Sequence, residues 1–277
     1  MLTEAASETN SMLDVDFEQL TDPGLVRHHN EDSIGCLLPE TIEAARHRGW
    51  LFVLADGVGG HERGEVASRI AVESLVAGFQ RAAPGDPLTS VLPRLIQNAN
   101  LKVYEAGMSA GPGGASMATT IVACALRFDR AVVAHVGDSR CYLIRNGRAL
   151  ALTRDHTVPS EQLRMGLITT REAARARTVN VLSRSVGAGM IVNVEVGEHQ
   201  VYTGDVLLLC SDGLHNSIAE KDMEHAIASH PELGQAAEAL VSLAKRRDGK
   251  DNISVQLIRV KGVERVGMYR GRHYKIR

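Results

Sequence analysis

The chain contains 277 residues, of which 44% are hydrophobic and 23% are charged, and its formal net charge at pH 7 is −2. These values are typical of a globular protein with a substantial core, and they exclude an intrinsically disordered chain. The near-neutral charge argues against a general nucleic-acid-binding protein, which would carry a basic excess. Aromatic residues make up only 4%, so we expect a core of aliphatic side chains.

Membrane insertion and secretion are not indicated by the sequence. No hydrophobic run approaches the roughly 18 residues that a membrane-spanning helix requires. Residues 1–11 lack the charged-then-apolar pattern of a secretory signal. The four cysteines are widely spaced without a C-x-x-C pair, which favours free thiols over disulfides or zinc ligands. We therefore expect a cytoplasmic protein with no membrane partner and no nucleic-acid partner.

Hydrophobic periodicity predicts the secondary structure of the first half of the chain. A flexible leader covers residues 1–13, followed by a strand at 14–20 that ends in the turn 21–24. A buried strand is predicted at 50–55, where the run WLFVLA is continuously apolar. Apolar residues recur at helical spacing after Gly64, and a second helix is predicted at 88–108 before the Gly-rich break at 111–114.

The second half is predicted to be rich in strands. We expect strands at residues 119–128, 131–136, 141–145, 191–196, 205–210 and 253–260, and a helix at 232–246. Asn146 and Gly147 favour a tight hairpin turn. A polar, Arg-rich insert at 160–177 has helical patches and a break at Gly166, and it is interpreted as a surface flap spanning about residues 155–180.

A single domain is predicted over residues 14–260, because no internal repeat and no Pro/Ser-rich linker divides the chain. The strands and helices do not alternate regularly, which disfavours a doubly wound parallel sheet and favours paired antiparallel sheets with helices outside. Residues 261–277 form a basic tail. It is interpreted as a solvated extension, and a docking segment for an acidic partner is the alternative.

Carboxylates occur where the predicted strands begin or end. Asp56, Asp138 and Asp212 each end or closely follow an apolar run, and Asp251 precedes one. Such residues can converge on one edge of a sandwich although they lie far apart in the sequence. Converged carboxylates repel one another unless cations neutralise them, and sets of oxygen ligands suit Mg²⁺ or Mn²⁺ better than zinc.

Other interpretations of these residues remain open. A lone Asp-Gly at a strand end is usually only a turn, and Glu31 and Asp32 could be ordinary loop charges. Asp138 could instead form an ion pair with Arg140. The occurrence of all these carboxylates in this order, with Arg27 nearby, makes turns alone a weak explanation.

The motifs that contain these residues resemble the metal-dependent protein phosphatases, the protein phosphatase 2C or PPM family, and in particular its bacterial members. The matching segments are TDPGLVRHHNED (21–32), ADGVGGH (55–61), GEVAS (64–68), MATT (117–120), VGDSR (136–140), CSDGL (210–214) and DNISV (251–255). They extend from residue 20 to residue 260 in the family order. The resemblance implies an α+β fold, a four-layer α/β/β/α sandwich of two antiparallel sheets flanked by helices.

The resemblance also implies two tightly bound Mn²⁺ or Mg²⁺ ions. Asp56 would bridge them, and the carbonyl of Gly57 would bind one of them. Asp212 and Asp251 would hold the other ion, and Asp138 would join Asp212 at a weaker third ion. Glu31 and Asp32 would reach the metals or their bound waters, and Arg27 would bind the substrate phosphate. Asn252 would support the site beside Asp251.

The implied activity is hydrolysis of phosphoserine and phosphothreonine in proteins. Two cations lower the pKa of a bridging water, so that hydroxide can attack phosphorus in line near neutral pH. The expected substrates are phosphorylated proteins made by a Ser/Thr kinase, and the enzyme is expected to be a monomer. The alternatives are a catalytically weak relative that acts as a phosphoprotein-binding scaffold and a hydrolase of small phosphoesters.

The chain departs from the family pattern at three places. The usual Gly-Thr-Thr is Ala118-Thr119-Thr120, and the Pro and Arg-Asn of the flap are replaced in residues 177–180 (RTVN). The position after the metal-binding Asp-Gly is Val58, as in bacterial members, rather than a His that could protonate the leaving group. His61 is a candidate for that acid, although a structural role is the favoured interpretation.

Overall fold

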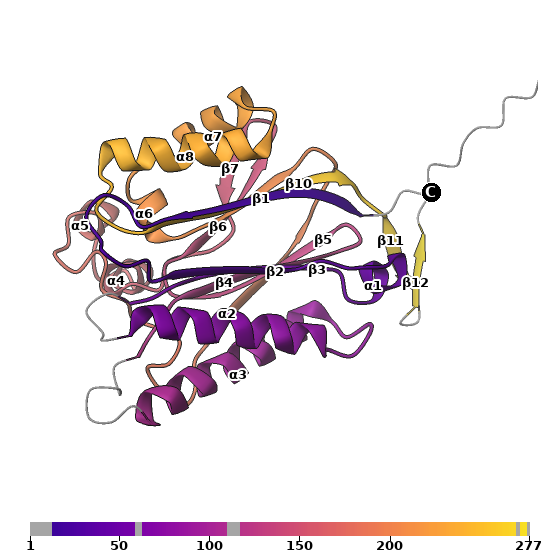
Figure 1. Cartoon of the computed structure of the whole chain (residues 1–277), viewed down its shortest axis with the longest axis horizontal. Helices are drawn as coiled ribbons and strands as arrows, with labels where there is room; N and C mark the ends of the chain where they lie inside the picture. Colours follow the sequence, from indigo (N-terminus) through magenta and orange to yellow (C-terminus); the bar gives the residue numbers. More distant parts are fainter. Residues whose placement is uncertain (1–12, 59–62, 110–116, 270–271, 276–277) are drawn as a thin grey trace, which may run out of the picture.

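The computed structural model describes residues 13–58, 63–109, 117–269 and 272–275, and these form a four-layered sandwich (Figure 1). Within them, two antiparallel five-stranded sheets stack face to face. Helices cover both outer faces of the stack. The predicted α+β architecture of two antiparallel sheets flanked by helices is confirmed.

The first sheet has the strand order β1-β10-β9-β6-β7. Its strands are β1 (Asp14–Asp22), β6 (Arg140–Arg145), β7 (Arg148–Ala151), β9 (Val206–Cys210) and β10 (Ile253–Gly262). The helices on its outer face are α6 (Asp212–His215), α7 (Glu220–Ser229) and α8 (Leu233–Arg247). The predicted hairpin turn at Asn146-Gly147 joins β6 to β7, and both residues have positive φ angles.

The second sheet has the strand order β2-β3-β4-β5-β8. Its strands are β2 (Asp32–Leu37), β3 (Trp50–Asp56), β4 (Ile121–Arg127), β5 (Arg130–Val136) and β8 (Glu195–Gln200). Helices α2 (Gly64–Gln80) and α3 (Leu88–Ser109) cover its outer face, and the short helix α1 (Ile42–His47) lies between β2 and β3 in the chain. The central strands β3, β4 and β5 are therefore covered on both sides, whereas alternate residues of the edge strand β8 are exposed.

Hydrophobic side chains fill three layers, one between the sheets and one under each group of helices. Strands β4 and β9 are buried along their whole length because both of their faces are covered. This explains why their sequences are continuous apolar runs rather than alternating ones. Between the sheets, the rings of Phe17 and Phe52 lie 5.3 Å apart.

The strand predicted at 191–196 is displaced in the structure, where β8 starts at Glu195. Before that point, the side chain of Gln97 on α3 satisfies the backbone. Its amide nitrogen donates to the carbonyl of Met190 at 2.8 Å, and its oxygen accepts from the Val192 N–H at 3.0 Å. The alternating apolar residues there consequently run alongside a helix instead of pairing with a strand.

The flap contains the helical patches that were predicted. They are α4 (Val158–Arg164) and α5 (Thr170–Ala173), separated by Gly166 with a φ of +70°. Thr157 caps the N-terminus of α4, and Thr169 with Glu172 forms a capping box on α5. The polar sequence of the flap therefore encodes short capped helices.

The tail beyond residue 260 is more structured than a solvated extension. Strand β10 continues to Gly262, and β11 (Val266–Tyr269) pairs with β12 (Arg272–Lys275) as a hairpin. Glu264 is buried, and both of its carboxylate oxygens accept hydrogen bonds from Arg46 at 3.1 Å. Most of the predicted leader, residues 1–12, lies outside the described residues.

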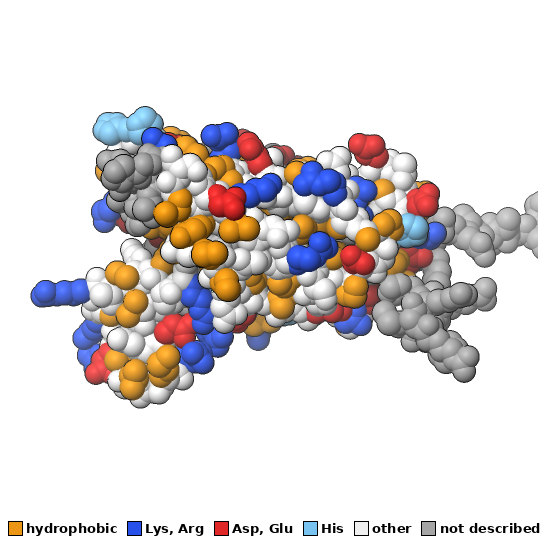
Figure 2. Space-filling model, turned by 90° about the horizontal axis from the view of Figure 1, so that it is seen from below, with side chains coloured by type: hydrophobic (Ala, Val, Ile, Leu, Met, Phe, Trp, Pro, Cys, Tyr) orange, Lys and Arg blue, Asp and Glu red, His pale blue; other side chains and the backbone are white. Residues whose placement is uncertain are grey.

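The face of the molecule on which α3 lies carries charges of both signs. Basic and acidic side chains are interspersed there with hydrophobic ones (Figure 2). Among the helices in the described ranges, none combines the length and the hydrophobicity needed to cross a bilayer.

Candidate active site

Four aspartates reach one end of the sandwich from the ends of strands. Asp56 is the last residue of β3, and Asp138 and Asp212 follow β5 and β9 by two residues. Asp251 lies two residues before β10. All four line one cavity of about 200 Å³, at the end of the sandwich where α4, α5 and α6 lie (Figure 1).

The same cavity is lined by other predicted residues and by part of the flap. Arg27, Gly57 and Val58 contribute to its wall, as does Thr120. The segment that returns from the flap supplies Asn180 and Leu182. Glu31, Asp32 and Asn252 do not line the cavity, and His61 lies outside the described residues.

Two threonines hold the backbone of Asp56. The Asp56 N–H donates to Oγ1 of Thr120 at 3.0 Å, and the Asp56 carbonyl accepts from the Thr120 N–H at 2.8 Å and from Oγ1 of Thr119 at 2.7 Å. Both threonines are buried. The Thr-Thr pair of the 117–120 motif therefore fixes where β3 ends and where the Asp56 carboxylate begins.

Position 57 requires a glycine because there is no room for a side chain. The Gly57 N–H donates to the carbonyl of Glu31 at 3.0 Å. A Cβ atom on residue 57 would collide with backbone atoms of Gly64 and Glu31. The start of β2, the end of β3 and the start of α2 can approach one another only because this residue has no side chain.

Asp32 lies directly behind Asp56. The two residues are partners in the register of β2 and β3, and Asp32 is partly buried. Its Oδ2 accepts a hydrogen bond from Oγ of Ser211 at 2.8 Å. Among the described residues, Oδ1 of Asp32 has no hydrogen-bond partner, although it is buried.

Asn252 connects the loop that carries Arg27 to the start of β10. Its side-chain oxygen accepts from the Glu31 N–H at 2.8 Å, and its amide nitrogen donates to the carbonyls of Pro23 and His29 at 3.0 Å each. All these partners are backbone groups. The side chain of Asn252 thus orients a whole loop next to Asp251, as a supporting residue would.

Arg27 contacts the carboxylate cluster at the mouth of the cavity. Its Nη2 donates to Oδ2 of Asp251 at 2.8 Å, and both side chains are about two-fifths exposed. A guanidinium has five N–H donors, so this bond leaves several free for another anion. The position combines an anchored cation with access from solvent.

Asp138 does not form the ion pair with Arg140 that the sequence left open. Arg140 instead donates two hydrogen bonds to Asp155, at 2.8 and 2.7 Å, and a third to the hydroxyl of Tyr142 at 2.8 Å. Within the described ranges, the Asp138 carboxylate therefore faces the cavity without its own guanidinium partner, although the Arg140 charge still lowers its pKa in part.

The aspartates are poorly stabilised as anions. Burial, followed by repulsion from neighbouring carboxylates, raises the pKa of Asp32 and of Asp138 to about 7 and that of Asp56 well above its ordinary value. The pKa of Asp212 rises to about 6 for the same reasons. Burial also raises the pKa of Glu31. A buried group of this kind, with an unpartnered carboxylate oxygen, fits hard divalent cations, which bind oxygen ligands.

Sequence reasoning did not identify the hydroxyls of Thr119, Thr120 and Ser211 as parts of the site. The hydroxyls of Thr119 and Thr120 bond the backbone of Asp56, and the hydroxyl of Ser211 bonds the carboxylate of Asp32. Their motifs were visible, but the partners of a hydroxyl depend on the pairing of distant strands.

Comparison with known proteins agrees with this geometry. The family model described as protein phosphatase 2C matches residues 29–247. The chain belongs to the protein phosphatase 2C family. It is a protein-serine/threonine phosphatase of the bacterial branch, and its substrates are phosphoproteins.

Relatives of known sequence and structure match most of the chain. The serine/threonine phosphatase stp of Listeria innocua is 35% identical over 91% of this chain and 96% of that protein. The protein phosphatase PhpP of Streptococcus pneumoniae is 31% identical over 88% and 97%. The S. agalactiae serine/threonine phosphatase has a TM-score of 0.81 at 32% identity, covering 89% of this chain and 100% of that chain. The catalytic domain of PstP, solved with 2 manganese ions, has a TM-score of 0.75 at 31% identity, over 90% and 99%.

The raised pKa values predict that the metal-free protein loses stability as the pH rises. In the folded chain the pKa values of Asp32 and Asp138 are about 7 and that of Asp56 is raised well above its ordinary value, against about 4 for an unfolded chain. The folded state therefore holds more protons, and its free energy of unfolding falls by about 1.4 kcal/mol per pH unit for each extra proton. Burial lowers the pKa of His156 and His215 to about 4. Because an unfolded histidine loses its proton around pH 6.5, this opposite effect weakens above that pH and is nearly complete by about pH 7.5.

Urea unfolding in chelator between about pH 6.5 and 8 measures this slope. We expect the free energy of unfolding to fall across the range, and to fall less steeply in Asp138→Asn, which removes one of the titrating groups. A constant or rising free energy would contradict the electrostatics described for the cluster.

Proposed function

We propose that this phosphatase hydrolyses phosphoserine and phosphothreonine at a centre of two Mn²⁺ or Mg²⁺ ions. The observation that carries the proposal is the convergence of four aspartates on one small cavity whose only lining cation is Arg27, among the residues described. Such an excess of buried negative charge calls for cations bound in the cavity.

The residues that would hold the ions are oxygen donors on the cavity wall. Asp56 and the carbonyl of Gly57 would serve one ion, with Asp56 shared, and Asp212 and Asp251 would serve the other. Glu31 and Asp32, which do not line the cavity, would reach the ions or their bound waters. Asp138 with Asp212 would bind a third, weaker ion. No sulfur or imidazole lines the cavity in the described chain, which matches the preference of Mn²⁺ and Mg²⁺ for oxygen.

The bound ions would supply Lewis acidity and a water acidic enough to act as the nucleophile near neutral pH. Arg27 would bind the phosphoryl oxygens, since a guanidinium fork matches their geometry and its position at the cavity mouth is open to a substrate. Asp251 orients Arg27 for this contact. Val58 lines the cavity without an exchangeable proton, so the leaving group is not protonated from that side chain.

The substrates would be phosphoproteins that a Ser/Thr kinase produces. The cavity of about 200 Å³ can hold a phosphoryl group but not a folded surface, so the phosphorylated side chain would extend into it. A phosphoprotein-binding scaffold and a small-phosphoester hydrolase remain the alternatives that the assay below separates.

Turnover of a phosphothreonine peptide with and without Mn²⁺ tests the proposal, beside turnover of small phosphate esters. We expect Mn²⁺-dependent activity on the peptide that is lost in Asp56→Asn and kept in Asp86→Asn, an exposed aspartate in the loop before α3. Without substrate, Mn²⁺ at 100 times its dissociation constant should stabilise the wild type by about 2.7 kcal/mol. If neither the melting temperature nor the activity changes when Mn²⁺ or chelator is added, the proposed metal centre is refuted.

Arg27→Ala should raise KM for the phosphothreonine peptide about tenfold or more, because charge-assisted hydrogen bonds to phosphate are lost. Mn²⁺ binding, measured by calorimetry, should persist. Arg27→Lys keeps the positive charge without the guanidinium fork, so its KM should fall between those of the wild type and of Arg27→Ala. Normal kinetics with a lowered melting temperature would show instead that Arg27 serves only as the ion-pair partner of Asp251.

Asp138→Asn should lower peptide turnover about tenfold or more, a barrier change of at least ~1.4 kcal/mol. The melting temperature should not fall, since Arg140 is bonded to Asp155 and loses no partner. Calorimetry should show the two tight Mn²⁺ events and the loss of the weakest one. Full activity in this variant would eliminate the third-ion role of Asp138.

A further inference from the structure

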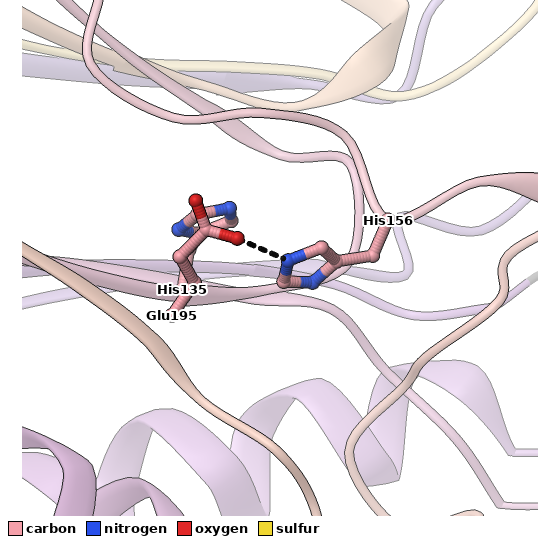
Figure 3. A group of neighbouring side chains, drawn as sticks. All are labelled: His135, His156 and Glu195. Atoms are coloured by element: carbon pink, nitrogen blue, oxygen red, sulfur yellow. Dashed lines mark hydrogen bonds and ion pairs between the residues drawn. The ribbon is translucent and has the colours of Figure 1, made fainter. Parts of the chain in front are cut away.

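A second group of titratable side chains lies beside the cavity, formed by His135, His156 and Glu195 (Figure 3). One ligand-type atom from each lies within 4.8 Å of the others. Both imidazoles are buried, and they stack with centroids 4.6 Å apart and an interplanar angle of 14°. Glu195 faces His135 in the register of β5 and β8.

Backbone partners determine where each imidazole carries its proton. The Gly137 N–H donates to Nδ1 of His156 at 3.2 Å, so neutral His156 is protonated on Nε2, 3.3 Å from Oε2 of Glu195. Nε2 of His135 lies 2.9 Å from the carbonyl of Arg154, which can only accept. Nη1 of Arg184 also lies 3.4 Å from Nε2 of His156. With Nδ1 accepting from Gly137 and Nε2 protonated, His156 has no lone pair left for a metal ion.

His156 bonds both polar backbone groups of Gly137. In addition to the bond at Nδ1, the His156 N–H donates to the Gly137 carbonyl at 3.0 Å. Gly137 has a φ of +105°, and a Cβ there would lie 2.6 Å from Cγ2 of Thr120. The turn that leads from β5 to Asp138 is thus packed against Thr120 on one side and bonded to His156 on the other.

This turn determines the direction of the Asp138 carboxylate. Oγ of Ser139 lies 2.7 Å from Oγ1 of Thr120, and Nε2 of His215 bonds the Asp138 carbonyl at 2.9 Å. Among the arginines that the structure describes, none is paired with the Asp138 side chain, and Arg140 is bonded to Asp155. The position of this carboxylate therefore depends on the backbone to which it is attached.

His156 also lies where the flap begins and returns. Its carbonyl accepts from the Ser183 N–H at 2.8 Å, and the next residue, Thr157, forms a β-bridge with Leu182. Leu182 lines the cavity. Glu195 is itself held by Nη2 of Arg154, at 3.1 and 3.2 Å. His156 thus connects the Asp138 turn and the first residue of β8 through its imidazole, and the returning flap through its backbone carbonyl.

We propose that His156 is a positioning residue for the phosphatase reaction, which holds the Gly137–Asp138 turn through Nδ1 while Glu195 orients its ring through Nε2. The inference rests on the proposed function for its kinetic consequence. Its structural consequence, a protected Gly137 amide, is independent of catalysis.

Two variants of equal polarity separate the two nitrogens. His156→Asn places Oδ1 where Nδ1 lies and keeps the acceptor for the Gly137 N–H, whereas His156→Gln places its amide nearer to Glu195 and leaves that N–H unpaired. The readouts are hydrogen exchange of the Gly137 amide in chelated protein, measured by NMR, and kcat and KM for a phosphothreonine peptide with Mn²⁺.

In His156→Gln, we expect Gly137 exchange to rise about tenfold or more, as the loss of one buried hydrogen bond implies. We expect kcat to fall about tenfold with KM within about twofold, because the bound groups are misaligned rather than lost. His156→Asn should stay within about threefold of the wild type in both exchange and kcat. Equal behaviour of the two variants, in exchange or in kcat, would overturn the proposal.

Two further outcomes are decided by the same design. If the wild type does not turn over the peptide, the proposed function fails, and Gly137 exchange in the two variants still decides the role of His156. If His156→Gln does not fold, Glu195→Ala replaces it, since Glu195 is partly exposed. We then expect faster Gly137 exchange and a lower kcat, and no change in either would overturn the proposal.

Discussion

Repulsion among buried carboxylates is the constraint on which the rest of this structure depends. The pKa values of Asp32 and Asp138 are raised to about 7 and that of Asp56 well above its ordinary value, so the metal-free fold holds these carboxylates together at a cost. That cost is offset by the strands that deliver them. β3, β5 and β9 are buried along almost their entire length, each between the opposite sheet and the helices that cover its own sheet. A deep apolar sandwich can therefore support a charged edge that would not be stable alone.

Most groups that position the carboxylates are uncharged. Thr119 and Thr120 hold Asp56, Asn252 holds the loop of Glu31, and His156, neutral because burial lowers its pKa to about 4, holds Gly137. Neutral donors and acceptors fix a backbone without cancelling the negative charge that a cation needs. The nearby guanidinium of Arg140 is engaged by Asp155 instead, so the charge of the cavity is preserved.

The sequence predicted the central strands and the convergence of the aspartates, because strands covered on both faces are continuous apolar runs that end at Asp56 and near Asp212. It did not predict β2, whose residues DSIGCL have few β-branched side chains, or α6 and α7. β8 was placed too early because the bonds from Gln97 to residues 190–192 join segments far apart in the chain. For the same reason, only the structure could decide between Asp138 and Asp155 as the partner of Arg140.

The cavity has two walls of different origin, one that carries the carboxylates and one that the flap contributes. The aspartates are attached to strands whose positions are set by the hydrophobic core. The opposite wall, Asn180 and Leu182, belongs to the returning flap, where the sequence departs from the family pattern. The two walls meet at several junctions: the bonds of His156 to Gly137, the bridge between Thr119 and Val186, and the bonds between Arg140 and Asp155. The flap can therefore vary in sequence while the carboxylate wall keeps its geometry, provided that these junctions are maintained.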